Sequence, residues 1–151
     1  MLRACVFLFA SVACFAVDAF YLGTWKIDSA VVGPWVDAAY KDDTVEMKTL
    51  VGKIVVMKPN GITGPHQLAC KGPKYVVKEY SADMLFQGAF GEMKSKDKTV
   101  DPLKVAAKLG FKGDSWKTLE TGCPTELDFH FIDPATTTFG LNNYVYFLKK
   151  Q

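Results

Sequence analysis

The sequence predicts a mostly β protein, a small antiparallel β-barrel with one or two short helices. Two observations predict this fold class. Glycine and proline recur densely and separate short apolar runs, a pattern that favours strands joined by turns. The segment 126–131 alternates polar and apolar residues, as a strand with one buried face does. Seven to nine strands can be counted, and closing them into a barrel removes their exposed edges.

The first strand is predicted at 21–32 and ends at Gly33-Pro34. A second strand at 53–58 leads into Asn60-Gly61, a pair suited to a tight turn with positive φ. Ile62 then begins a short partner strand. At period two, one face of the first strand carries Tyr21, Trp25, Ile27 and Val31.

The best helix is predicted at 101–110, where Asp101 is the N-cap, Pro102 the first helical residue and Gly110 the stop. A shorter helix is expected at 42–50, capped by Asp42 or Asp43. The charged stretch 92–98 mixes both signs and is interpreted as a solvated loop. Further strands are expected at 74–80, 84–90, 115–121, 126–132, 136–140 and 144–149.

Residues 1–19 resemble a cleavable signal peptide, which leaves 20–151 as a single domain. Arg3 provides the positive charge, and an uncharged apolar run of about 14 residues follows, too short for the roughly 20 that span a bilayer. Cleavage after Ala19 or after Ala16 fits the small-residue rule. An uncleaved anchor and a lipid-modified Cys14 are the alternatives. No later segment is apolar enough to span a membrane, so a secreted or periplasmic location is expected.

Removal of the signal would leave two cysteines, Cys70 and Cys123. In an exported domain two cysteines are expected to pair, and the bridge would be worth about 4 kcal/mol in the chain-entropy picture. Two free thiols or an intermolecular bridge are the alternatives. The formal net charge of +2 is too even to favour nucleic acid as a partner.

The motif Gly23-Thr24-Trp25 at the start of the first strand resembles the GxW signature of lipocalins and the wider calycin group. The resemblance implies an eight-stranded barrel in which Trp25 closes one end. It also implies that a basic residue near the end of the last strand, here Lys149 or Lys150, packs across this tryptophan.

Aromatic residues on the predicted strands are the best candidates for a binding site, because inward-pointing rings can line an apolar pocket. They can equally fill a solid core, and an eight-stranded interior is wide enough for either outcome. Six of these residues are the predicted ligand contacts: Trp25, Tyr75, Phe86, Phe129, Phe131 and Tyr146.

Glu126, Asp128 and His130 share one face of a predicted strand and could act as acid, base or metal ligands. The simpler interpretation is that this polar face meets water while the phenylalanines opposite fill the core. A metal site would need His66, which the disulfide could bring towards Glu126 and His130. No phosphate-binding or serine-nucleophile motif is present, and no cofactor is expected.

Three functions follow from these patterns. The first is a secreted protein that binds a small apolar or amphipathic molecule inside a lipocalin-like barrel. The second is a solid barrel that binds or inhibits another protein through the loop at 66–74, which the disulfide would hold. The third is an enzyme or metal protein that uses Glu126, Asp128 and His130. A non-enzymatic binding protein is favoured.

Overall fold

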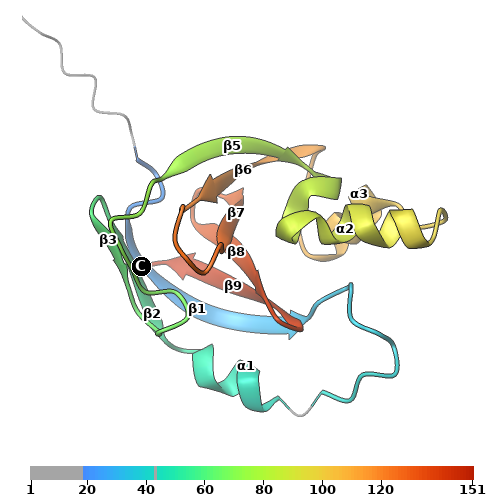
Figure 1. Cartoon of the computed structure of the whole chain (residues 1–151), viewed down its shortest axis with the longest axis horizontal. Helices are drawn as coiled ribbons and strands as arrows, with labels where there is room; N and C mark the ends of the chain where they lie inside the picture. Colours follow the sequence, from blue (N-terminus) through green and yellow to red (C-terminus); the bar gives the residue numbers. More distant parts are fainter. Residues whose placement is uncertain (1–18, 43) are drawn as a thin grey trace, which may run out of the picture.

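The computed structural model describes residues 19–42 and 44–151, and its main element is one curled antiparallel sheet (Figure 1). The nine strands of the described residues follow the order β4-β3-β2-β1-β9-β8-β7-β6-β5. β1 joins the two halves of the sheet because it pairs with both β2 and β9. The end strands β4 and β5 are not hydrogen-bonded to each other, so the sheet forms a curled half-barrel. The mostly β prediction is confirmed.

The elements have the following bounds. The strands are β1 (Gly23–Val32), β2 (Ile54–Lys58), β3 (Gly61–Thr63), β4 (Cys70–Lys71), β5 (Val76–Ser81), β6 (Ser115–Glu120), β7 (Asp128–Asp133), β8 (Thr136–Leu141) and β9 (Tyr144–Lys150). The helices are α1 (Val45–Leu50), α2 (Leu85–Lys96) and α3 (Pro102–Lys108), and a 3-10 turn η1 (Ala82–Met84) precedes α2.

The inner face of the half-barrel carries one apolar core, and alternation along the strands supplies it. In β9, Tyr144, Tyr146 and Leu148 belong to this core, whereas Val145 and Phe147 face the other way. Fully buried members from the remaining strands include Trp25, Ile27, Val55, Leu119 and Phe139.

The outer face carries a second core, formed where α2 and α3 pack beside β5, β6, β7 and β9 (Figure 1). Trp116 and Val145 contribute from the sheet, and Phe86, Phe90 and Ala106 contribute from the helices. The helices therefore bury part of a sheet face that alternation alone would assign to solvent.

The prediction of a strand at 84–90 is wrong, because these residues form η1 and the beginning of α2. A run this short and apolar fits a buried strand or a buried helix equally well. Phe86, Gln87 and Gly88 have positive φ values of 53°, 54° and 80°, so the chain makes a left-handed turn before α2 continues. The stretch 92–98, expected as a loop, belongs largely to this helix.

A β-bulge in β1 changes the predicted faces of the first strand. The register with β9 shifts between Ile27 and Ser29, which turns Ala30 towards the inner core and leaves Val31 42% exposed. Tyr21 lies before the strand begins. The extra residue of the bulge breaks the period-two pattern on which the prediction depended.

The two predicted helices differ in how well their starts were located. Asp101 caps α3 as predicted, because its Oδ1 accepts a hydrogen bond from the Leu103 backbone N–H at 3.0 Å. α1 begins later than expected, at Val45, and the residue before it, Thr44, provides no side-chain cap.

The predicted export signal lies outside the described residues except for Ala19. A disulfide joins Cys70 to Cys123, which confirms the predicted pairing and is compatible with an extracellular protein. None of the helices in the described residues is long and apolar enough to cross a bilayer.

Candidate functional site

The predicted ligand contacts on the inner face are packed against one another. Trp25 and Tyr146 have no solvent exposure, and Phe129 and Phe131 are 1% and 5% exposed. Phe139 stacks on Tyr146 with ring centroids 4.9 Å apart and planes 12° apart. Side chains therefore fill the inner face, which was one of the two outcomes expected for the aromatic set.

Of the remaining two predicted contacts, one lies in the outer core and the other at the edge of the inner core. Phe86 is on α2 and belongs to the outer core, where its ring lies 4.8 Å from that of His130. Tyr75 lies just before β5 and packs against Tyr21, with ring centroids 4.9 Å apart.

A cation–π contact joins Trp25 to the last strand. Lys150 lies opposite Trp25 in the β1–β9 register, and its Nζ is 5.4 Å from the centroid of the indole. The same Nζ donates a hydrogen bond to the Phe20 carbonyl at 2.6 Å, while Trp25 Nε1 donates to the Tyr21 carbonyl at 2.9 Å. Lys150 thus ties the segment before β1 to the final strand.

A hollow of about 550 Å³ lies where β6 begins and β7 ends, beside Phe20; we call it the rim pocket. Phe20 packs edge-on against Phe131 at 4.8 Å, and Lys117 Nζ lies 5.1 Å from the Phe20 ring centroid. The apolar lining consists of Phe20, Trp116, Phe131, Ile132 and Pro134. The charged lining consists of Glu79, Lys112, Lys117 and Asp133.

Lys112 and Lys117 are exposed at the edge of this pocket. The ion pairs formed among the described residues join other side chains and leave both ammonium groups without a carboxylate partner. The rim pocket thus combines an apolar wall with polar groups that can orient a ligand. Sequence reasoning identified Phe131 but not Phe20 or Trp116, because the pocket depends on which strand ends meet.

His130 is fully buried on the outer face and both of its ring nitrogens are engaged. Nε2 accepts the backbone N–H of Phe86 at 3.0 Å, and Nδ1 lies 2.8 Å from Thr118 Oγ1. Because Nε2 accepts, the proton of the neutral ring is on Nδ1 and is donated to the threonine. Burial lowers the pKa of His130 from 6.5 to about 3, so the ring is neutral at ordinary pH.

The polar face of β7 is not the uniformly solvated surface that was expected. Glu126 lies before the strand, has a positive φ of 52° and is exposed. His130, in contrast, accepts a hydrogen bond from the backbone of Phe86 and so stabilises the left-handed turn there. His66 is also exposed. Among the described residues, no group of three or more histidine, cysteine or acidic side chains is placed to hold a metal ion.

Glu120, which sequence reasoning missed, lies opposite Asp128 in the register of β6 and β7. Its Oε1 is 2.8 Å from Lys78 Nζ and accepts a hydrogen bond from the Tyr80 hydroxyl at 2.7 Å. These two partners lower the pKa of Glu120. Burial, followed by the negative charge of Glu120, raises the pKa of Asp128 to about 6. The alternation of β6 could have signalled Glu120 only if the pairing of β6 with β7 had been known.

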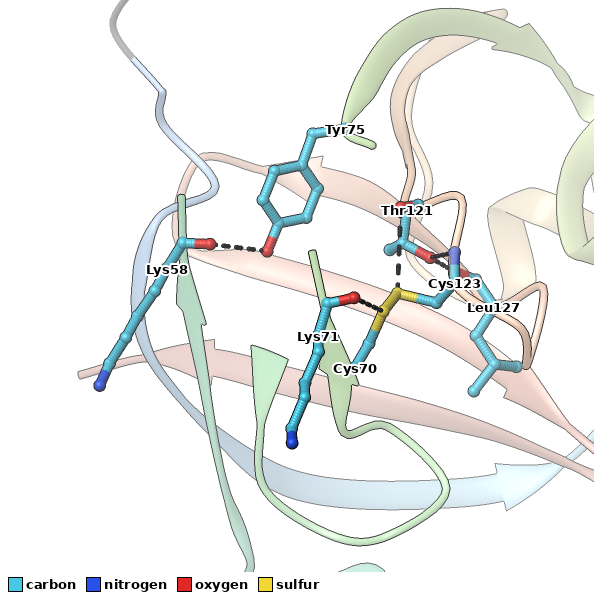
Figure 2. The surroundings of a disulfide bond; sticks show 7 residues. All are labelled: Lys58, Cys70, Lys71, Tyr75, Thr121, Cys123 and Leu127. Atoms are coloured by element: carbon cyan, nitrogen blue, oxygen red, sulfur yellow. Dashed lines mark hydrogen bonds between the residues drawn. A yellow bond between two sulfur atoms is a disulfide. The ribbon is translucent and has the colours of Figure 1, made fainter. Parts of the chain in front are cut away.

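The disulfide holds the loop at 66–74 where the sheet fails to close. Cys70 is in β4 and Cys123 follows β6, with Cα atoms 6.0 Å apart, so the bond crosses from one end of the sheet towards the other (Figure 2). Beside it, the Tyr75 hydroxyl donates to the Lys58 carbonyl at 3.0 Å (Figure 2). His66, Gln67, Ala69, Lys71, Gly72 and Lys74 are exposed in this loop.

Comparison with known proteins gives no match to this chain among family models, curated proteins or solved structures. The function is therefore inferred from the geometry described above.

Proposed function

We propose that this chain is an exported, lipocalin-like binding protein that holds a small apolar or amphipathic molecule in the rim pocket. The observation that carries the proposal is the hollow of about 550 Å³ walled by Phe20, Trp116 and Phe131. This volume lies within the range typical of small-molecule sites, roughly 300–1,000 Å³. The contact of Lys150 with Trp25 supports the lipocalin-like interpretation.

The proposed ligand places its apolar part against the aromatic wall and its polar part at the charged edge. Trp116 and Phe131 are both 5% exposed, so each presents only a small apolar surface to the pocket. Lys112 and Lys117 provide donors for a carboxylate, sulfonate or carbonyl oxygen. Two carboxylates at the same edge, Glu79 and Asp133, limit the affinity for ligands of high negative charge.

The test uses 1-anilinonaphthalene-8-sulfonate, an amphipathic probe whose fluorescence rises in apolar surroundings. Ser115 is exposed and lines the pocket, so Ser115→Phe fills the hollow without entering the core. The matched control is Val76→Phe, at an exposed position of β5 outside the pocket lining. We expect saturable binding to the wild type and to Val76→Phe, and at least about tenfold weaker binding to Ser115→Phe. Equal binding to all three proteins would refute a rim-pocket site.

A second candidate function is protein binding through the loop at 66–74. The observation that favours it is the disulfide, which holds an exposed and locally basic segment in one conformation, as preorganised recognition loops require. Capture of a specific partner from the exported fraction by the wild type, and its loss in Lys71→Glu/Lys74→Glu, would support this function. Equal recovery by both proteins would exclude this loop as the contact surface.

A further inference from the structure

The rim pocket carries charged groups of both signs in equal number. Its lining includes the carboxylates of Glu79 and Asp133 and the ammonium groups of Lys112 and Lys117. All four side chains are exposed. Because two negative and two positive charges cancel, the lining exerts no net attraction on an anion or on a cation. A molecule that carries one charge of each sign is complementary to such a lining.

Two of these charged residues, Glu79 and Lys117, lie side by side on neighbouring strands. Glu79 of β5 is directly opposite Lys117 of β6 in the antiparallel register. Side chains of such a pair project from the same face of a sheet, with Cβ atoms about 4.5–5.5 Å apart. The two ligand groups that Glu79 and Lys117 attract must therefore also lie close together.

Glu79 and Lys117 form no ion pair, either with each other or with another residue of 19–42 and 44–151. Lys117 places its Nζ 5.1 Å from the centroid of the Phe20 ring. Lys78, which precedes Glu79 in the sequence, pairs with Glu120 instead. A ligand that pairs with Glu79 and Lys117 therefore breaks no ion pair of the protein.

The other two charged residues of the lining are positioned by hydrogen bonds to nearby groups. Asp133 Oδ1 accepts the backbone N–H of Ala135 at 2.8 Å, which fixes this carboxylate in the turn between β7 and β8. The Lys112 carbonyl accepts the indole N–H of Trp116 at 2.8 Å, which fixes the Lys112 backbone to the aromatic wall. These contacts keep one further charge of each sign at the edge of the pocket.

The accessible apolar part of the pocket favours an aromatic ligand. Phe20 and Ile132 are half-buried and Pro134 is exposed, so these residues present apolar surface to the hollow. The position of Phe20 is fixed by its edge-on contact with Phe131 and by the hydrogen bond from Lys150 to its carbonyl. Contact between two aromatic rings contributes more than the burial of their area alone. A ligand ring therefore packs favourably against Phe20.

We propose that the rim pocket binds an aromatic α-amino acid as a zwitterion, with its carboxylate paired to Lys117 and its ammonium group paired to Glu79. This inference rests on the proposed function, because it names the ligand class of the same pocket. An α-amino acid carries both charged groups on one carbon atom, which matches the adjacent positions of Glu79 and Lys117. Its ring packs against Phe20.

The test compares three molecules that share a phenylethyl body and differ in charge: L-phenylalanine, 3-phenylpropanoate and 2-phenylethylammonium. Binding to the folded chain at pH 7 is measured by NMR titration, and the indole N–H signal of Trp116 reports on the pocket. We expect L-phenylalanine to bind about fivefold more tightly than either singly charged molecule, the upper end of what one exposed ion pair contributes.

Two variants separate the two charges. Glu79→Gln should weaken the binding of L-phenylalanine about fivefold without weakening that of 3-phenylpropanoate. Lys117→Gln should weaken the binding of L-phenylalanine by a similar factor without weakening that of 2-phenylethylammonium. Glu126→Gln and Lys98→Gln are the matched controls, since both residues are exposed and lie outside the pocket lining, and they should bind all three molecules as the wild type does.

No binding of L-phenylalanine to the wild type, no preference for it over the singly charged molecules, or equal binding to the wild type and Glu79→Gln would overturn the proposal. Titration of the same proteins with 1-anilinonaphthalene-8-sulfonate separates this inference from the proposed function. Probe binding that Ser115→Phe weakens, without a preference for L-phenylalanine, would overturn the amino-acid assignment and retain the pocket as a binding site. Probe binding that is absent from the wild type, or equal in Ser115→Phe, would refute both.

Discussion

His130 and Tyr146 are both excluded from solvent, on opposite faces of one sheet, yet they differ in hydrogen bonding. The register aligns His130 with Thr138 and Phe147, on the outer face, whereas Tyr146 points to the inner face. Both ring nitrogens of His130 have partners, and the hydroxyl of Tyr146 has none. A buried polar network therefore fixes α2 to the sheet, whereas the inner core contains a buried hydroxyl without a hydrogen-bond partner.

The pH dependence of stability should show the largest effect on the His130 side of this comparison. Its pKa is about 6.5 in the unfolded chain and about 3 in the folded protein, so the unfolded chain binds the extra proton between these values. The contribution of neutral, buried His130 to the free energy of unfolding is fully present above pH 6.5 and is lost as the pH falls towards 3. The loss in unfolding free energy is at most about 5 kcal/mol, at 1.36 kcal/mol per pKa unit.

Urea denaturation of the wild type and His130→Gln across this pH range measures the effect. The raised pKa of Asp128 acts in the opposite direction, because a carboxyl that binds protons more tightly when folded stabilises the protein as the pH falls below about 6. The difference between the two proteins removes this contribution. A difference that does not change with pH would show that His130 titrates normally in the folded protein.

The disulfide should matter more to the inner core than to the outer one. It closes the gap between the two ends of the sheet, and the entropy of the 53-residue separation that it spans corresponds to about 4 kcal/mol. Cys70→Ala/Cys123→Ala should lose this much unfolding free energy. Hydrogen exchange should accelerate in β3 and β4 and remain slow in α2, and uniform acceleration would contradict the division into two regions.

Thr118→Val should break the polar network on the His130 side with little change in shape. Thr118 is fully buried, and its hydroxyl is the partner of His130 Nδ1. The variant leaves a buried N–H without an acceptor, which costs about 1–3 kcal/mol in unfolding free energy. Thermal denaturation measures the loss, and a variant as stable as the wild type would show that the imidazole finds another partner.

Lys150→Met should have a smaller effect, confined to the Trp25 end of the sheet. It removes the ammonium over the indole and the hydrogen bond to the Phe20 carbonyl but keeps the aliphatic stem. A cation–π contact at an exposed position is worth about 0.5–1 kcal/mol. Lys26 is exposed on the neighbouring strand β1, so Lys26→Met is the control; an equal loss in both variants would show that Lys150 has no special role.

Much of the fold could be predicted from the sequence because alternation and turn residues act locally. Asn60-Gly61 marked the position of the β2–β3 turn, although neither residue has the positive φ that was expected, and Asp101 marked the start of α3. Three features could not be predicted, because each depends on contacts with distant strands or with a partner segment. They are the bulge at Ile27, the two-residue strand β4 and the helical conformation of 85–90.

The candidate sites were less predictable than the fold for the same reason. Phe131 was identified from alternation, but its pocket neighbours Phe20 and Trp116 come from other segments. His130 was interpreted as solvent-facing because nothing local indicates that α2 covers it. Tyr146 was identified as an inward aromatic, whereas the absence of a partner for its hydroxyl follows only from the complete three-dimensional packing.

The unfolding free energy of Tyr146→Phe measures whether the Tyr146 hydroxyl is buried without a hydrogen-bond partner. Tyr144→Phe, two residues away on the same strand and face, is the control because its hydroxyl donates to Asp42. We predict that Tyr146→Phe equals or exceeds the wild type in stability, by up to about 1–3 kcal/mol, whereas Tyr144→Phe is less stable. A loss of more than about 1 kcal/mol in Tyr146→Phe would contradict the claim, because it would show that the hydroxyl has a partner in the folded protein.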